Sequence, residues 1–226
     1  MVTETVESPI TVGNMSKLLL TSLFANVASL LPVCMPEIVD AGATVAFIPT
    51  ASRASWPRFH VRAAERAFER LGVKVDVLDV DAETSAEIRR RIDRDDLIYV
   101  SGGNTFYLLQ ELRRQDADTA IREAVISGKP YVGESAGSVI ASTNIAYIRW
   151  MDSTAKAPDL HGYADCDALG LVDFRPVPHW GSLPFLASTR TIMSRYGGRY
   201  AMKPMRNDEA IAVSGGATRF LRGIPA

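Results

Sequence analysis

Residues 131–142 read Tyr-Val-Gly-Glu-Ser-Ala-Gly-Ser-Val-Ile-Ala-Ser, and they contain the pattern Gly-x-Ser-x-Gly directly after an apolar pair. This pattern is typical of a nucleophile elbow, a sharp turn from a strand into a helix that exposes a serine hydroxyl. The glycines leave room for the chain to turn back on itself. The pattern therefore predicts that Ser135 is a nucleophile, and that the helix after it directs free N–H groups toward an oxyanion.

Apolar strands alternate with helices on both sides of this elbow. Besides the elbow strand, the predicted strands cover residues 17–22, 43–50, 73–80, 96–101, 171–179 and 210–213, with a last one through residue 221. Continuous apolar strands separated by helices indicate a mostly parallel sheet that is covered on both faces. We therefore expect an α/β fold of three layers, αβα, with ligands bound beyond the carboxyl ends of the strands.

The composition is that of an ordinary globular protein. The chain has 226 residues, of which 47% are hydrophobic and 23% are charged, and no linker rich in Pro, Gly or Ser divides it. We expect one domain over residues 1–226, with a loose leader over residues 1–15. The net charge of −1 gives no general attraction to nucleic acid or to anionic membranes.

Localisation and cofactors are predicted from what the sequence lacks. The N-terminus has no signal-peptide pattern, and residues 18–31 are too short and too interrupted by polar side chains to span a bilayer. A cytoplasmic protein without a membrane partner is therefore expected. The two cysteines and three histidines match no metal-ligand spacing, so we expect neither a metal nor an organic cofactor.

A serine hydroxyl needs a positioned base to become a nucleophile at neutral pH. His179 is the best candidate because it ends a predicted strand, where Pro178 restricts the backbone that leads to it. His161, in the long polar segment over residues 150–167, is the alternative. The sequence thus favours a Ser135–His179 pair.

The base in turn needs an acid that holds its tautomer. Asp152, in the segment that follows the elbow helix, is the first choice. The alternatives that stay open are Asp208 or Glu209, just before the late strand, and Asp173 or Asp165.

An oxyanion needs two hydrogen-bond donors. The N–H of Ala136, directly after the nucleophile, is the first. The turn Gly102-Gly103-Asn104 also follows a strand, and its glycines allow a backbone N–H to approach a substrate closely. We therefore predict Gly103 as the second donor and Asn104 as a substrate-binding residue.

At these residues the sequence resembles the peptidase E (aspartyl dipeptidase) family of serine peptidases. The resemblance covers most of the chain, and it rests on the segments at residues 19–22, 47–51, 99–105, 133–137 and 178–179. It implies a class I glutamine amidotransferase-like (flavodoxin-like) fold. It also implies that Ser135 is the nucleophile and His179 the base, with Asp152 as the third member of the triad.

The resemblance also implies a substrate. The best-known activity of the family is hydrolysis of dipeptides with an N-terminal aspartate, which an arginine on the helix after the histidine binds. Arg190 is the counterpart in this sequence, and Glu134 replaces an aromatic residue of the best-known members. We therefore expect Arg190 and Glu134 to be substrate-binding residues.

The resulting expectation is a serine hydrolase that cleaves small peptides, including Asp-Xaa dipeptides, as a monomer or homodimer. One alternative is a cyanophycinase-like or other amidohydrolase with the same triad. Another alternative, from a different class, is a catalytically silent amidotransferase-like domain that binds a ligand or a partner.

Overall fold

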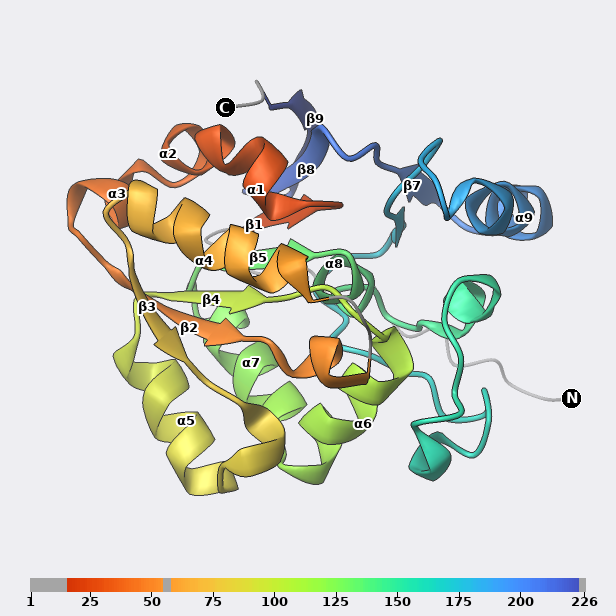
Figure 1. Ribbon diagram of the computed structural model, residues 1–226, viewed down its shortest axis with the longest axis horizontal. Coiled ribbons are helices and arrows are strands. Elements are labelled where there is room, and N and C mark those ends of the chain that lie inside the picture. The colour runs from red at the N-terminus through yellow and green to blue at the C-terminus, as the bar shows by residue number, and fades with distance from the viewer. Residues whose placement is uncertain (1–15, 55–57, 224–226) are drawn as a thin grey trace, which may run out of the picture.

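The computed structural model describes residues 16–54 and 58–223, so the predicted leader over residues 1–15 lies outside the described residues. Its centre is a seven-stranded sheet in the order β3-β2-β4-β5-β1-β8-β9 (Figure 1). The strands of this sheet are β1 (Lys17–Thr21), β2 (Thr44–Ile48), β3 (Lys74–Val77), β4 (Leu97–Val100), β5 (Tyr131–Glu134), β8 (Glu209–Ser214) and β9 (Ala217–Arg222). The first five strands of the order are parallel, whereas β8 and β9 add antiparallel pairs at one edge.

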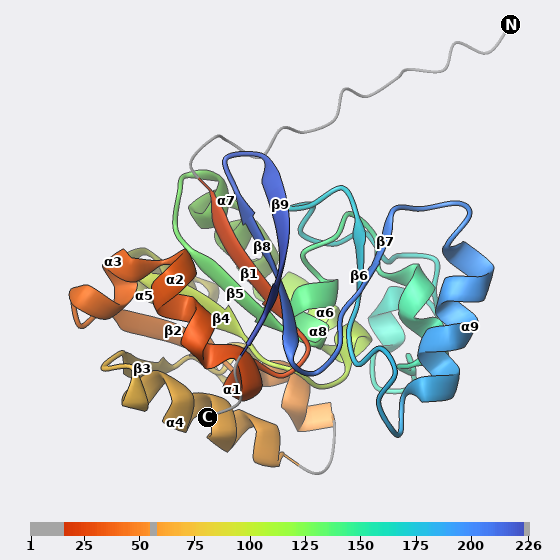
Figure 2. The ribbon, with the colours of Figure 1, turned by 90° about the horizontal axis from the view of Figure 1, so that it is seen from above.

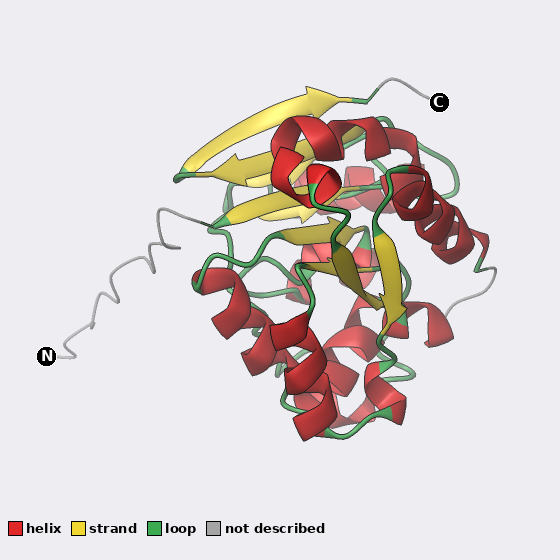
Figure 3. Cartoon of the chain, turned by 90° about the vertical axis from the view of Figure 1, so that its left-hand side faces the viewer, coloured by secondary structure: helices red, strands yellow, loops and turns green. Residues whose placement is uncertain are grey.

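Helices cover both faces of the sheet and enclose two apolar cores (Figures 1 and 3). One face carries α1 (Phe24–Val27), α2 (Leu31–Cys34), α3 (Pro36–Asp40) and α4 (Phe59–Arg70). The other face carries α5 (Ser85–Arg94), α6 (Thr105–Arg114), α7 (Ala117–Ile126) and α8 (Ala136–Val139). The short 3-10 turns are η1 (Ala28–Leu30), η2 (Thr50–Ala54), η3 (Val80–Ala82), η4 (Ala146–Trp150) and η5 (Pro158–Leu160). The three-layer α/β prediction is thereby confirmed.

One predicted strand is much shorter than expected. Instead of residues 171–179, only β6 (Arg175–Val177) is a strand, and it pairs with β7 (Met202–Pro204) in a separate two-stranded sheet. Prolines in and beside β6 cannot donate to a ladder, which explains why it ends early. Figure 2 shows this pair and α9 (Leu186–Tyr196) gathered beside the main sheet. The segment before His179 is therefore not a strand of the main sheet.

The register of the main sheet determines which turns surround the elbow. In the β4–β5 pair Val100 lies opposite Gly133, and in the β1–β5 pair Thr21 lies opposite Glu134. The carboxyl ends of β1 and β4 therefore flank the end of β5. Consequently the β1–α1 turn and the Gly102-Gly103 turn both lie next to Ser135.

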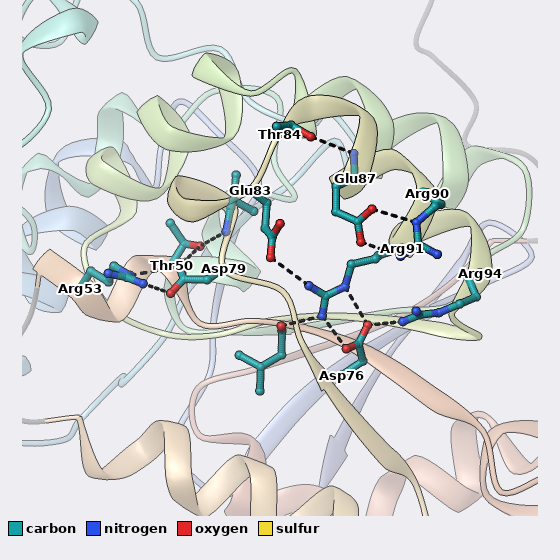
Figure 4. A network of polar contacts seen from close by, with 12 residues as sticks. Thr50, Arg53, Asp76, Asp79, Glu83, Thr84, Glu87, Arg90, Arg91 and Arg94 are labelled. Carbon is teal, nitrogen blue, oxygen red and sulfur yellow. Dashed lines mark hydrogen bonds and ion pairs between the residues drawn. The ribbon is translucent and has the colours of Figure 1, made fainter.

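Three consecutive arginines on α5, Arg89, Arg90 and Arg91, all pair with acidic side chains. Arg91 is buried and donates to Asp76 on β3, with a distance of 2.9 Å from Nε to Oδ2 (Figure 4). Arg90 instead pairs with Glu87 one turn away on the exposed side of the helix. Arg91 thus attaches α5 to the outermost parallel strand.

Among the described residues, none of the helices has the length and apolarity needed to cross a membrane.

We predict that Arg91→Ala lowers the free energy of unfolding by about 1–3 kcal/mol, because a half-buried carboxylate at Asp76 loses its main partner. The matched control is Arg90→Ala, which removes an exposed pair and should cost at most about 0.5 kcal/mol. Urea denaturation of both variants at pH 7 measures the difference. Equal effects of the two substitutions would contradict the assignment.

Candidate active site

Ser135 occupies a strained turn between β5 and α8. Its backbone has φ 49° and ψ −105°, which is a sparsely populated conformation for a residue with a side chain. A side chain at position 137 would lie well inside contact distance of the Val100 carbonyl, so only glycine allows α8 to pack this closely against β4. The predicted helix after the elbow is present and has four residues.

His179 lies directly against the serine. The distance from Ser135 Oγ to His179 Nε2 is 2.8 Å, and that from His179 Nδ1 to Asn207 Oδ1 is also 2.8 Å. Because an amide oxygen only accepts hydrogen bonds, Nδ1 carries the proton and Nε2 is free to accept from the serine hydroxyl. This is the arrangement that a general base needs.

The backbone of His179 is held by Ser22, in the β1–α1 turn. The His179 N–H donates to Ser22 Oγ at 3.0 Å, and that hydroxyl donates to the Met205 carbonyl at 2.9 Å. His179 itself has φ 61°, an uncommon value for a residue with a side chain. Hydrogen bonds to the main sheet and to the β7 side therefore maintain this strained conformation.

The imidazole of His179 is shielded from water. Phe185 stacks on it with ring centroids 4.7 Å apart, and the residue is only 6% exposed. Burial lowers the pKa of His179, the hydrogen bond to Asn207 opposes this effect, and nearby His60 adds to it. The imidazole is therefore neutral at pH 7, as a general base would need to be to take a proton from a serine.

The structure does not bring Asp152 to His179, so the prediction for the third member is wrong in its geometry. The Asp152 carboxylate accepts from the N–H and the hydroxyl of Thr105, at 2.8 and 2.6 Å. Burial raises the pKa of this carboxyl, and the two bonds from Thr105 oppose the shift. Asp152 thus caps the first turn of α6.

Asn104 is engaged at the same place. Its side-chain oxygen accepts from the Tyr107 N–H at 2.8 Å, and its amide donates to the Ser153 carbonyl at 2.9 Å. Both polar groups of the predicted substrate-binding side chain are therefore occupied by the protein.

The other acids and the alternative base also lie elsewhere. Asp208 pairs with Arg222, Glu209 accepts from the Arg206 N–H, Asp165 pairs with Arg113, and both Asp173 and His161 are exposed. Asn207 was missed because only acids were considered for its role. Two of the predicted alternatives, Asp208 and Glu209, are the next two residues after Asn207 in the sequence.

The two predicted oxyanion donors lie on either side of the serine. Gly103 has φ 145°, and a side chain there would collide with the Ala51 backbone. A Cβ atom on Gly102 would lie 3.2 Å from Ser135 Cβ, which places this turn against the nucleophile. Within the described ranges, no hydrogen bond occupies the N–H of Gly103 or of Ala136. Both groups remain available to a substrate.

The two predicted substrate-binding residues with charged side chains do not point into one site. Glu134 is buried, and its Oε2 accepts from the Phe24 N–H at 2.8 Å. Burial is the main cause that raises the pKa of Glu134 to about 7. Arg190 is exposed on α9, and we find no polar contact of its side chain with the described part of the chain.

Two hollows open near this end of the sheet. The larger, of about 920 Å³, is lined by Pro49, Ser52, Arg53, Arg58, Phe59, Val61, Arg62, Glu65 and Asp79. Its lining includes neither Ser135 nor His179. The smaller, of about 390 Å³, has Asn207 and Trp180 in its wall and so lies beside His179. Within the described ranges, no three His, Cys, Asp or Glu side chains are arranged to hold a metal ion.

Comparison with known proteins matches this arrangement to one family. The model of peptidase family S51 matches residues 19–221. The chain belongs to peptidase family S51. It is therefore a serine-type peptidase, and the resemblance to peptidase E is confirmed.

Several relatives support this membership. An uncharacterized peptidase of Listeria monocytogenes is 47% identical over 201 residues, which cover 89% of this chain and 96% of the relative. Peptidase E of Pasteurella multocida is 36% identical over 141 residues, or 62% of this chain and 55% of that protein. The crystal structure of a Listeria monocytogenes EGD-e protein proposed to be a peptidase E superposes with a TM-score of 0.85 at 45% identity, covering 92% and 98% of the two chains.

We predict that Asp152→Ala lowers the free energy of unfolding by about 1–3 kcal/mol, because the Thr105 N–H and hydroxyl lose their acceptor. Asp152→Asn keeps an acceptor and should cost much less. Asp173→Ala, at an exposed position, is the control. Denaturation of the three variants tests the cap, and a loss of turnover in Asp152→Asn with unchanged stability would contradict it.

A second prediction concerns the pH dependence of stability. The folded protein keeps a proton on Glu134 up to about pH 7, whereas the unfolded chain releases it near pH 4.5. The contribution of Glu134 to the free energy of unfolding is therefore fully present below pH 4.5 and is lost as pH rises through about 7. This contribution amounts to about 3 kcal/mol. Relative to Glu134→Gln, the wild type should lose this amount between pH 4.5 and pH 8 in urea titrations. A constant difference between the two proteins would contradict the raised pKa.

Proposed function

We propose that the protein hydrolyses short peptides through an acyl-enzyme, with Ser135 as nucleophile, His179 as general base and Asn207 as the residue that orients the base. The observation that carries the proposal is the line of two 2.8 Å contacts from Ser135 Oγ through the imidazole to Asn207 Oδ1. Family membership supports the peptidase reaction, and the strained elbow supports the choice of serine.

The proposed reaction begins when Ser135 Oγ attacks the carbonyl carbon of the scissile peptide bond. His179 Nε2 takes the hydroxyl proton, and Asn207 Oδ1 keeps the Nδ1 proton in place. The imidazolium then gives its proton to the leaving amine, which departs and leaves an acyl-serine. Water enters, His179 removes a proton from it, and hydrolysis of the ester regenerates the hydroxyl.

The N–H groups of Gly103 and Ala136 stabilise the oxyanion in this proposal. Both are backbone donors. Gly103 lies in a turn packed so closely on the Ala51 backbone that no side chain fits there, and Ala136 is the first residue of α8. Donors that are already oriented need no reorganisation when charge develops on the substrate oxygen. Losing one such donor typically costs about 10²–10³ in rate.

The proposed substrates are small peptides in the cytoplasm, and the enzyme acts as a monomer or homodimer. The resemblance to peptidase E adds Asp-Xaa dipeptides as the first candidates. Arg190, the cation that the resemblance assigns to the aspartate, lies exposed on α9. The specificity for aspartate therefore depends on whether α9 presents Arg190 to a bound peptide.

We predict that Ser135→Ala and His179→Ala each lower kcat by about 10⁴–10⁶, because removing one member of a nucleophile–base pair removes most of the catalysis that the pair provides. Asn207→Leu removes the acceptor for Nδ1–H and should lower kcat by about 10²–10⁴. Asn207→Asp retains an acceptor and serves as the matched control, with turnover at or above the wild-type level. Initial rates on a panel of dipeptides with varied N-terminal residues measure all four variants.

Fluorophosphonate labelling separates this proposal from its rivals. Label on Ser135 of the wild type, absent in Ser135→Ala, is the expected result. Absence of label on the wild type would instead support the alternative of a catalytically silent amidotransferase-like domain that binds a ligand or a partner. Hydrolysis of a β-Asp-Arg polymer without cleavage of any dipeptide in the panel would identify the cyanophycinase-like alternative.

A further inference from the structure

A carboxylate is buried directly beneath the nucleophile. Glu134 is the last residue of β5 and precedes Ser135, yet it is only 1% exposed. One of its oxygens, Oε2, accepts from the Phe24 N–H at 2.8 Å. The other, Oε1, makes no hydrogen bond of good geometry with the described residues. A buried acceptor without a partner is costly, so its presence beside the catalytic serine calls for a reason.

A buried donor without a partner lies on the neighbouring strand. Tyr99 on β4 is fully buried, and its hydroxyl also makes no hydrogen bond of good geometry in the described part of the chain. Tyr99 stands opposite Val132 in the β4–β5 register, and Glu134 is two residues further along the same face. Burial raises the pKa of the Tyr99 hydroxyl, and the nearby Glu134 carboxylate raises it further.

The same carboxylate touches both turns that build the site. Phe24 lies two residues after Ser22, whose hydroxyl holds the backbone of His179 at 3.0 Å. On the opposite side, a Cβ atom on Gly102 would lie 3.3 Å from Glu134 Oε1. Glu134 therefore contacts the turn that holds the base and the turn that carries the second oxyanion donor.

We propose that Glu134 is a positioning residue, which in its ionised form holds the Ser22–Phe24 turn and the Gly102-Gly103 turn against Ser135 with Tyr99 as its partner. The ionised carboxylate has acceptors for the Phe24 N–H, the Tyr99 hydroxyl and the Gly102 backbone together. A protonated carboxyl has a donor in place of one acceptor; if Oε1 carries the proton, it can donate to the Tyr99 hydroxyl, and the Gly102-Gly103 turn then loses its acceptor. The kinetic consequence rests on the proposed function, whereas the contacts do not.

The charge state of this carboxyl changes near neutral pH. Burial raises the pKa of Glu134 to about 7, against the opposing effects of the Phe24 N–H, the Tyr99 hydroxyl and the Gly102 backbone. Tyr99 is the titratable group that acts on Glu134 directly. Glu65 on α4 raises the pKa of Tyr99, and His60 contacts the Gly102 carbonyl at 3.1 Å. Glu134 is thus poised to link the geometry of the site to pH.

The first test is independent of turnover. Backbone amide shifts of Phe24 and Gly102 are followed by ¹H–¹⁵N NMR on the full chain between pH 5 and pH 9. Both amides should titrate together near pH 7 in the wild type, and neither should do so in Glu134→Gln, although His60 and His179 remain. Amides that do not titrate, or that still titrate in the variant, would overturn the proposal.

The second test uses the pH profile of acylation by a fluorophosphonate. The wild-type rate should fall roughly tenfold as pH drops through 7, because small displacements of positioned groups cost one to two orders of magnitude. Glu134→Gln should lack this step and remain at the low rate. Tyr99→Phe loses a donor to the ionised form, so its step should move to higher pH. Tyr147→Phe, which removes another buried hydroxyl bonded to Pro176, should leave the step in place.

The two tests separate the possible failures. Titrating amides in a wild type that is never acylated would defeat the proposed function and leave the role of Glu134 in holding the turns intact. Acylation with identical pH profiles in the wild type, Glu134→Gln and Tyr99→Phe would defeat this inference and leave the proposed function intact.

Discussion

The hydrogen bond between Ser135 Oγ and His179 Nε2 joins two separate sheets, and the site depends on how these sheets are held together. The serine belongs to the main sheet, whereas the histidine follows β6 of the two-stranded sheet. Ser22 provides the link, because its hydroxyl accepts from His179 and donates to Met205. A hydroxyl that donates and accepts at the same time can hold two segments of the chain in place, which an apolar side chain cannot do.

Much of the fold was predictable because its signals are local. The buried parallel strands are continuous apolar runs, and turns with glycine separate them from the helices. The length of β6 was not predictable in the same way. Leu171, Val172, Phe174 and Val177 give the segment an apolar pattern, but Pro176 and Pro178 remove two ladder donors. Only the position of β7 shows that a second small sheet replaces the expected strand.

The contacts of the candidate site were predictable where the residue type indicates the chemistry. Ser135 and His179 are in contact, as a nucleophile and its base would be, and the glycine turn lies against Ser135, while their roles stay predictions. The third member depends on tertiary contacts between distant segments, which spacing along the chain does not reveal. Asp152 is a carboxylate, as the third member was expected to be, but it caps α6. Asn207 lies against His179 Nδ1 but has an uncharged amide. The burial of Glu134 is likewise a property of the packed sheet and not of the pattern around it.

An amide in place of a carboxylate changes what the proposed base, His179, can do. Asn207 selects the correct tautomer of His179 through its oxygen, but it adds no charge to stabilise the imidazolium. Burial lowers the pKa of His179, so the imidazole is a weaker base that stays available at neutral pH. Burial also raises the pKa of Glu134 to about 7, so burial favours the neutral form of both groups. Acid can therefore act on this site through a buried carboxyl next to Ser135 as well as through the imidazole.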